Sequence, residues 1–347
     1  MLEGDLNVTR RNRQWVLQNR PQDRLKLENF RFHEADFILP DLEDGQILVR
    51  NRMFACAPTL RNGMNEPGRS YAASATLNEP IAGMAGVEVL QSRNDEYPVG
   101  ARLVVRSRWE DFSVITPDAS MSPVLRVPND MTIEDAMGIY GMNSLAAYFG
   151  MLRVARPRRG ETVVVSGAAG STGSMAAQIA RIHGCRVIGI AGGQSKCEWL
   201  REGARISEAI DYKSEDVAAR LAQLCPEGVS AFFDNVGGTI LQAVVDNIAR
   251  RGRIALCGQI AAYNSDSSAP GPRDMMKLVY GSVRIEGFLL SDFIPDIEQA
   301  RTELVKWNNA GELVHRVDVR EGFENLPSSF LDLFSGANAG TLLVRTV

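Results

Sequence analysis

The sequence predicts an α/β protein in which a doubly wound parallel sheet is inserted into a smaller β-rich domain. Two observations lead to this expectation. From about residue 132 onward, apolar runs alternate with segments of helical periodicity, as in parallel sheets wound with helices. Before that point, and again at the C-terminus, the chain shows short strand-like runs separated by turn residues.

The first 120 residues carry four strand signals rich in Val, Leu and Ile. They fall at residues 14–18, 46–52, 85–91 and 101–107. Gly, Pro and Asp separate them, as in Pro40-Asp41 and Pro98-Val99-Gly100. Strands this short and irregularly spaced predict a compact, barrel-like domain.

The middle of the chain alternates between strand and helix signals. A helix is expected over residues 133–148, and the apolar run at 162–166 is typical of a strand buried on both faces. Further strands are expected at 186–191, 206–211, 230–234, 253–257 and 283–290, with helices at 171–183, 195–201, 215–224, 240–250 and 274–280. Six strands alternating with helices predict a parallel, doubly wound sheet.

The C-terminal part is expected to return to the first domain. An amphipathic helix over 295–309 is followed by strand signals at 315–319 and 341–345. The domain boundaries predicted from this pattern are residues 1–138 for the β-rich domain, 139–310 for the inserted domain and 311–347 for the return.

Composition narrows the class of protein. The 347 residues hold 38 Lys and Arg against 42 Asp and Glu, and this mildly acidic balance disfavours a nucleic-acid partner. No run approaches 18 uninterrupted apolar residues, so no membrane span or membrane partner is expected. Residues 1–13 lack the apolar core of a secretory signal, and Arg10, Arg11 and Arg13 are expected to form a solvated tail.

The cysteines and histidines indicate a reduced, metal-free protein. Five Cys at irregular spacing, with no C-x-x-C pair, predict free thiols and a cytoplasmic location. The three His are far apart in sequence and form no H-E-x-x-H pattern, so no metal site is expected.

A glycine motif follows the first strand of the predicted sheet. Gly167 allows a tight turn, Gly170 lets the backbone approach a pyrophosphate, and Gly173 lets the next helix pack closely. The free N–H groups of a helix beginning at Ser171 favour an anion. The alternative is a glycine-rich turn with no ligand. A hydrolase is disfavoured, because Ser166 does not lie in a G-x-S-x-G frame.

The end of the second strand indicates which dinucleotide is bound. NAD sites usually place an acid there, but this chain reads Ala191-Gly192-Gly193-Gln194-Ser195-Lys196. The glycines, Gly192 among them, leave room, and Lys196 supplies a positive charge for a 2′-phosphate. NADP(H) is therefore the expected cofactor, although Lys196 could also be an ordinary surface lysine.

Several fragments in order along the chain match one family. They include Arg13-Gln14-Trp15-Val16-Leu17, Ala147-Tyr148-Phe149-Gly150, the glycine motif, Asp211-Tyr212-Lys213, Asn235-Val236-Gly237-Gly238, Cys257-Gly258-Gln259-Ile260, Glu286-Gly287-Phe288 and Glu321-Gly322-Phe323-Glu324-Asn325. The chain resembles the zinc-independent medium-chain dehydrogenases/reductases, in the branch of prostaglandin reductases, 2-alkenal double-bond reductases and curcumin reductases. The resemblance implies a Rossmann sheet inserted in a GroES-like catalytic domain. The G-H-E motif of the zinc-dependent relatives is absent at Gly83-Met84-Ala85.

The resemblance also implies cofactor-binding residues. Around the pyrophosphate it places Gly170, Ser171, Thr172, Gly173 and Ser174. It places Lys196 and Tyr212 beside the 2′-phosphate, and Asn235 on the cofactor backbone. The nicotinamide would be bordered by Cys257, Gly258, Gln259, Ile260, Tyr263, Phe288, Leu289 and Leu290, and Asn338 would reach the cofactor from the C-terminal segment. Each of these residues could instead have a structural role.

Two stretches depart from the family pattern next to the expected substrate. The branch usually reads D-P-Y-M-R where this chain has Ala57-Pro58-Thr59-Leu60-Arg61. It usually reads M-P-G where this chain has Met142-Asn143-Ser144. Thr59, Arg61, Asn143 and Tyr263 are the expected substrate-lining residues, with fewer aromatic walls than in relatives.

The expected activity is NADPH-dependent reduction of a carbon–carbon double bond conjugated to a carbonyl. Hydride would reach the β-carbon, and Tyr263, the nicotinamide ribose, or both would stabilise the enolate. Tyr263 as a purely structural loop residue stays open, as do a quinone reductase and a non-catalytic NADP-binding protein. A homodimer is expected if the strand at 283–290 is a sheet edge that pairs with its twin.

Overall fold

The computed structural model describes residues 10–68, 73–117, 124–264 and 271–346, which form two compact units. The first unit comprises the chain up to Met137, then Val317–Ala337 and the chain from Leu342. The second unit comprises Gly138–Arg316 and Asn338–Thr341. The chain thus leaves the first unit, builds the second and returns. No helix in the described ranges is both long and apolar enough to cross a bilayer.

The first unit is built on a seven-stranded sheet. Its strand order is β14-β15-β3-β4-β5-β7, and β6 also pairs with β3. A separate hairpin pairs β1 with β2. The strands are β1 (Arg10–Leu17), β2 (Phe30–Phe37), β3 (Ile47–Ala55), β4 (Ala82–Ser92), β5 (Arg102–Arg108), β6 (Phe112–Ile115), β7 (Leu125–Arg126), β14 (Val317–Glu321) and β15 (Thr341–Arg345).

Large aromatic side chains fill the core of this unit. Trp109, Phe54, Phe323 and Phe330 are fully buried, so residues from both ends of the chain share one core. The short helices around the sheet are η2 (Leu27–Asn29), α1 (Leu60–Gly63), α2 (Ile133–Gly138), η6 (Phe323–Asn325) and α11 (Leu326–Ser335). The predicted β-rich class of this part of the chain is confirmed.

The second unit is a six-stranded parallel sheet in the order β10-β9-β8-β11-β12-β13. The strands are β8 (Thr162–Ser166), β9 (Arg186–Ala191), β10 (Glu208–Asp211), β11 (Val229–Asp234), β12 (Ile248–Leu256) and β13 (Arg284–Gly287). The strand order reverses between β8 and β11, as in a doubly wound sheet. The predicted Rossmann architecture is confirmed.

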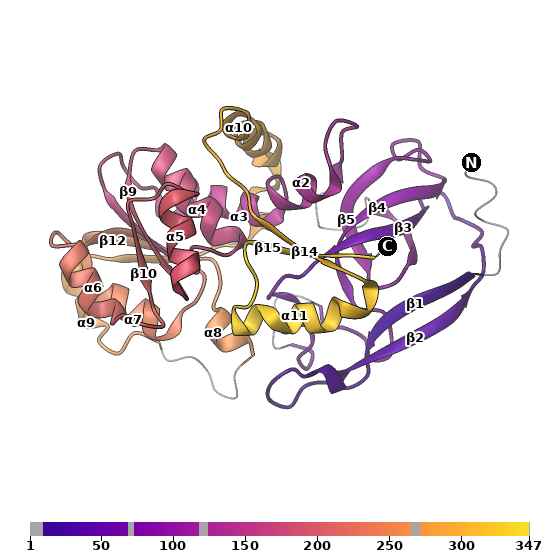
Figure 1. Ribbon diagram of the computed structural model, residues 1–347, viewed down its shortest axis with the longest axis horizontal. Coiled ribbons are helices and arrows are strands. Elements are labelled where there is room, and N and C mark those ends of the chain that lie inside the picture. The colour runs from indigo at the N-terminus through magenta and orange to yellow at the C-terminus, as the bar shows by residue number, and fades with distance from the viewer. Residues whose placement is uncertain (1–9, 69–72, 118–123, 265–270, 347) are drawn as a thin grey trace. The chain divides into compact units, whose positions relative to one another are not determined.

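Helices link these strands in the alternation expected from the sequence (Figure 1). They are α3 (Met142–Phe149), η4 (Gly150–Ala155), α4 (Ser171–Ile182), α5 (Gln194–Glu202), α6 (Val217–Leu224), α7 (Gly238–Asp246), α8 (Ile260–Tyr263), α9 (Met276–Gly281), η5 (Leu290–Asp296) and α10 (Ile297–Asn309). Helices α3, α4 and α10 pack together, and α6, α7 and α9 form a second group.

The structure corrects several predictions. Arg10, Arg11 and Arg13, expected in a solvated tail, belong to β1, and Arg13 pairs with Asp111 at 2.8 Å. Three element boundaries also differ. The helix expected over 133–148 is broken at residues 139–141 into α2 and α3. The helix expected over 240–250 ends at Asp246, because strand β12 already begins at Ile248. The strand expected over 283–290 ends at Gly287, and a 3-10 helix begins at Leu290.

Candidate cofactor and active site

The glycine loop between β8 and α4 has the geometry that its spacing predicts. Gly167 adopts a positive φ of 58°, which glycine reaches without steric cost. A Cβ on Gly173 would lie 2.2 Å from the Gly167 carbonyl oxygen, so only glycine lets the helix start this close to the turn. Gly170 is the N-cap of α4 and offers no capping side chain. The first turn of α4 therefore presents backbone N–H groups that suit an anion.

The predicted pyrophosphate residues occupy different environments. Ser171 and Thr172 are partly exposed at the start of α4. Ser174 is buried, and its hydroxyl donates to the Ser171 carbonyl at 3.1 Å. Of the three hydroxyl-bearing residues, Ser171 and Thr172 are thus the partly exposed ones.

Asp234 joins the ends of three strands next to this loop. The Ser166 hydroxyl donates to Asp234 at 2.7 Å, and the N–H groups of Val236 and Gly237 also donate to its carboxylate. The Asp234 carbonyl accepts from the N–H groups of Cys257 and Gly258. The carboxyl ends of β8, β11 and β12 are therefore held together at the point where the strand order reverses, which is where such sheets bind ligands.

Asn235 is fixed at the same place by two bonds to Ser166. Its N–H donates to the Ser166 hydroxyl at 2.8 Å, and its Nδ2 donates to the Ser166 carbonyl at 2.7 Å. The Asn235 carbonyl accepts from the N–H of Ile260. Sequence reasoning selected Asn235 but missed Ser166 and Asp234 as its support. The sequence does carry a signal for Asp234, because an acid directly ends the buried apolar strand Ala231-Phe232-Phe233-Asp234.

The segment from Cys257 to Tyr263 folds back on itself at this edge. The Tyr263 hydroxyl accepts a hydrogen bond from the Gln259 N–H at 3.1 Å. A Cβ on Gly258 would lie 3.1 Å from the same hydroxyl oxygen, so glycine there leaves room for the tyrosine. Because the hydroxyl accepts from Gln259, its own proton is available to another acceptor. Burial raises the pKa of the Cys257 thiol to about 12, which disfavours a nucleophilic thiolate.

The loop after β9 is shaped by residues at the end of β10. A Cβ on Gly192 would lie 2.8 Å from the Tyr212 ring, so the ring lies against this glycine. The Asp211 carboxylate accepts from the Gly193 N–H at 2.7 Å, from the Lys213 N–H and from the Ser214 hydroxyl. These bonds, the Gly193 one foremost, lower the pKa of Asp211.

The sequence did not predict that the acid Asp211 would lie beside the loop after β9. The prediction considered only the residues that end β9, and β10 delivers Asp211 beside them. The Asp211 oxygens are occupied by loop donors. Tyr212 remains 46% exposed, and Lys196 lies in the first turn of α5, partly buried.

Two other predicted cofactor segments have clear structural contacts. Phe288 packs on Gly150, where a Cβ would lie 2.4 Å from its ring, and edge-on to Phe233. Leu289 is exposed, and Leu290 begins η5. The Asn338 Nδ2 donates to the Gly340 carbonyl, and Gly340 pairs with Gly170 in a parallel bridge. The bridge places the segment of Asn338 beside the start of α4.

The predicted substrate-lining residues lie in both units. In the first unit Thr59 is exposed before α1, whereas Arg61 is 4% exposed. The Arg61 guanidinium donates to Asn65 and to the Asp23 carbonyl. In the second unit the Asn143 Nδ2 donates to the Ser171 hydroxyl at 2.8 Å. Arg61 and Asn143 are therefore both held by contacts within the protein.

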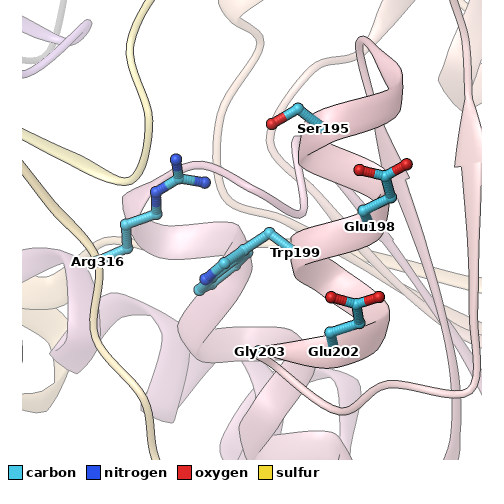
Figure 2. A pocket seen from close by; sticks show the side chains of 6 residues that line it. All are labelled: Ser195, Glu198, Trp199, Glu202, Gly203 and Arg316. Atoms are coloured by element: carbon cyan, nitrogen blue, oxygen red, sulfur yellow. The ribbon is translucent and has the colours of Figure 1, made fainter.

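A separate pocket lies on α5. Ser195, Glu198, Trp199, Glu202, Gly203 and Arg316 line it, and the Arg316 guanidinium lies over the Trp199 ring (Figure 2). Glu198 and Glu202 make this pocket unsuited to a phosphate group. In the described part of the chain, no three His, Cys, Asp or Glu side chains gather closely enough to hold a metal ion.

Two protein-family models match the chain. The model described as an N-terminal domain of oxidoreductase matches residues 13–124. The model described as a zinc-binding dehydrogenase matches residues 171–307. The two matches fall in the first and second unit, respectively.

Individual relatives match over almost the whole chain. YfmJ of Bacillus subtilis, named as an NADP-dependent oxidoreductase, is 37% identical over 97% of this chain and 98% of its own. The NADPH-dependent curcumin reductase of Escherichia coli is 31% identical over 96% and 97%. The crystal structure of CurA from Vibrio vulnificus in complex with NADPH superposes with a TM-score of 0.88 at 32% identity, covering 96% of this chain and 99% of CurA.

The fold, the strand-end site and these relatives define an oxidoreductase. The chain belongs to the medium-chain dehydrogenase/reductase family, in the branch that contains the NADPH-dependent curcumin, 2-alkenal and prostaglandin reductases. The family resemblance found in the sequence is confirmed.

Proposed function

We propose that the protein reduces the carbon–carbon double bond of an α,β-unsaturated carbonyl compound with NADPH, without a metal ion. One observation carries this proposal. Asn235, the Cys257–Tyr263 segment and the uncapped start of α4 meet at the reversal point of a doubly wound sheet. The NADPH complex of CurA and the alkenal and curcumin reductases among its relatives support the same cofactor and substrate class.

The residues present fit a dinucleotide. Gly170 and Gly173 keep side chains away from the start of α4, and its N–H groups suit the pyrophosphate. Beyond β9, Gly192 opens the space that Tyr212 borders, and Lys196 supplies the positive charge for a 2′-phosphate. Asp211 does not counter this preference, because its oxygens already accept three hydrogen bonds from the loop.

Tyr263 is the proposed catalytic residue. NADPH, when bound, supplies a hydride, which this proposal directs to the β-carbon of the substrate. Negative charge then develops on the carbonyl oxygen of the substrate, and the Tyr263 hydroxyl donates a hydrogen bond to that oxygen while keeping its proton. Its bond from the Gln259 N–H holds the hydroxyl oxygen without using that proton. Tyr263 or water then protonates the α-carbon.

A panel of substrates tests this function. NADPH oxidation is measured with aliphatic enones, aromatic enones and simple quinones, each with and without EDTA. Turnover of enones that EDTA leaves unchanged is the expected result. Activity confined to quinones would assign a quinone reductase, and binding of NADPH without any turnover would assign a non-catalytic protein. Loss of activity in EDTA, restored by zinc, would contradict the metal-free part.

The proposal includes a homodimer in the cytoplasm. Strand β13 is the last strand of the parallel sheet, so a second copy could extend the sheet at this edge. All five cysteines are free thiols, which suits a reducing compartment. Sedimentation of the purified protein at two concentrations would distinguish a dimer from a monomer.

A further inference from the structure

Four polar side chains of the second unit form one continuous hydrogen-bonded chain. The Asn143 Nδ2 donates to the Ser171 hydroxyl at 2.8 Å. The hydroxyls of Ser171 and Thr341 are 2.5 Å apart, and the Thr341 hydroxyl lies 3.3 Å from His315 Nε2. The chain thus links α3, the first residue of α4 and two positions of the C-terminal segment. Its second member, Ser171, lies at the helix terminus proposed for the cofactor pyrophosphate.

The backbone holds the members of this chain in place. The bridge between Gly170 and Gly340 keeps Thr341 beside Ser171. The Thr341 N–H donates to the Arg316 carbonyl, which keeps Thr341 beside the segment of His315. Thr341 itself is 3% exposed. The three contacts are partly buried, with Thr341 as their buried centre.

The His315 ring is also confined. A Cβ on Gly138 would lie 1.8 Å from the His315 Cε1 atom, so the ring occupies the space that this glycine leaves open. This contact explains why a glycine is the last residue of α2. It also keeps Nε2 aimed at the Thr341 hydroxyl.

The hydrogen bonds that link these four side chains can run in two directions, depending on which atoms carry the hydrogens. A serine hydroxyl has one hydrogen and two lone pairs, and an Nε2 atom either donates or accepts. If Nε2 carries a hydrogen, His315 donates to Thr341 and Thr341 donates to Ser171. Ser171 then accepts from both Thr341 and Asn143, and its own hydrogen remains available. If Nε2 is bare, Thr341 donates to His315, and Ser171 donates its hydrogen to Thr341.

We propose that His315 is a positioning residue for the cofactor pyrophosphate. It carries a hydrogen on Nε2 and, through Thr341, leaves the Ser171 hydroxyl free to donate to a phosphate oxygen. The proposal rests on the proposed function, because it requires NADPH at the start of α4. His315, Thr341 and Asn143 then share one role, which is to fix the donor direction of the Ser171 hydroxyl at that helix terminus.

Direct binding of NADPH to the purified protein, measured by fluorescence titration, tests the proposal. Thr341→Val keeps the shape of the side chain and removes the hydroxyl, and His315→Phe keeps a ring on Gly138 and removes Nε2. Each is expected to raise the NADPH Kd about three- to tenfold, the effect of losing one net hydrogen bond. The NADPH Kd of the double variant is expected to be no higher than the higher of the two single-variant values, because both substitutions break the same hydrogen-bonded chain.

Matched controls separate positioning from general damage. Thr341→Ser keeps the hydroxyl and is expected to restore most of the affinity. Ser107→Ala removes a buried hydroxyl of the first unit, which donates to Ser113 at 3.1 Å outside this chain, and is expected to leave the Kd unchanged. Thermal unfolding of each variant identifies any that fails to fold.

The protonation of His315 provides a second readout that needs no cofactor. ¹⁵N NMR of imidazole-labelled wild-type protein is expected to show a hydrogen on Nε2. A bare Nε2 would overturn the proposal, even if every variant failed to fold. An unchanged Kd in folded Thr341→Val and His315→Phe would also overturn it. Failure of the wild-type protein to bind NADPH would instead contradict the proposed function, while the NMR result would still decide the direction of the chain.

Discussion

The Ser166 hydroxyl donates a 2.7 Å hydrogen bond to the Asp234 carboxylate, and this bond joins two strands on either side of the strand-order reversal. Ser166 ends β8 and Asp234 ends β11, and both side chains are buried. Burial raises the pKa of Asp234, while donors such as the Gly237 N–H oppose that rise. Since Ser166 also bonds Asn235, the pair holds a residue of the proposed cofactor site in place.

Removal of the Ser166 hydroxyl should therefore weaken both folding and cofactor binding. Ser166→Ala leaves the Asp234 carboxylate and the Asn235 N–H each without one partner. A loss of about 1–3 kcal/mol in the free energy of unfolding is expected, as for an unsatisfied buried polar group. Chemical denaturation measures this loss, and an NADPH titration should show a higher Kd because Asn235 loses an anchor.

Ser107→Ala is the matched control for this prediction. Ser107 is also buried, and its hydroxyl donates to Ser113 in the first unit. A smaller loss of stability and an unchanged NADPH Kd are expected. If Ser166→Ala behaved like this control, the Ser166–Asp234 pair would not be a support of the cofactor site.

A second buried carboxylate, Glu110, predicts a pH dependence of stability. Glu110 is 7% exposed and accepts hydrogen bonds from Asn12, Gln14 and Ser113. Burial raises its pKa in spite of these bonds. Above the pKa that Glu110 has in the unfolded chain, the folded state therefore binds the carboxyl proton of Glu110 more tightly than the unfolded state does. The contribution of Glu110 to stability therefore falls as the pH rises through the interval between the two pKa values.

Comparison with Glu110→Gln isolates this effect, because glutamine does not titrate. The free energy of unfolding of Glu110→Gln, relative to wild type, should rise with pH in that interval and be flat on either side. Its slope should not exceed about 1.4 kcal/mol per pH unit, the limit for one proton. Urea unfolding at a series of pH values measures it. A difference that stays constant, or falls, over acidic pH would contradict the raised pKa of Glu110.

Lys196 should determine the preference for NADPH over NADH. Lys196→Ala is expected to raise the Michaelis constant for NADPH by roughly 10- to 100-fold, the cost of one charge-assisted contact of about 1.5–3 kcal/mol. The constant for NADH should barely change. Lys277→Ala is the control, because Lys277 pairs with Asp246 at 2.7 Å and is not a proposed cofactor residue. Equal use of both cofactors by the unmodified protein would overturn the assignment.

The sequence was sufficient to predict most of the parallel sheet. In that sheet β8 and β9 have the predicted bounds, because apolar runs bounded by glycines leave few alternatives; β15, in the sheet of the first unit, also has its predicted bounds. β2 and α11 were missed. Three of the eight residues of β2, Phe30–Phe37, are charged and most of the strand is exposed, so its apolar signal is weak. The close approach of the His315 ring to Gly138, the last residue of α2, joins residues 177 positions apart in sequence, so local periodicity could not reveal it.

The candidate site was predictable one strand at a time but not across strands. The sequence alone selected candidate residues after β8, β9, β11 and β12, and these stay predictions. It did not reveal that Asp211 crosses from β10 to the Gly193 N–H, or that Asn143 donates to Ser171. Both contacts join residues whose proximity depends on the folded sheet and helices rather than on spacing along the chain.

The chemistry proposed for Tyr263 gives a final prediction. Tyr263→Phe removes the hydroxyl that would donate to the developing enolate, while the ring and its place in α8 remain. Loss of one oxyanion donor costs on the order of 100- to 1000-fold in turnover. Because Tyr263 is not expected to be the sole donor, a loss of about 10- to 100-fold in kcat is expected, with little change in the NADPH Kd.

Gly258→Ala is a useful companion variant, since its new Cβ would lie 3.1 Å from the Tyr263 hydroxyl oxygen and displace it slightly. A smaller fall in kcat is expected, and in the Tyr263→Phe background the same substitution should have little further effect. Steady-state kinetics on an enone substrate, together with NADPH titrations, measure both quantities. If Tyr263→Phe kept full turnover on a proven substrate, Tyr263 would be an anchor of the Cys257–Tyr263 segment. Protonation would then fall to water or another donor.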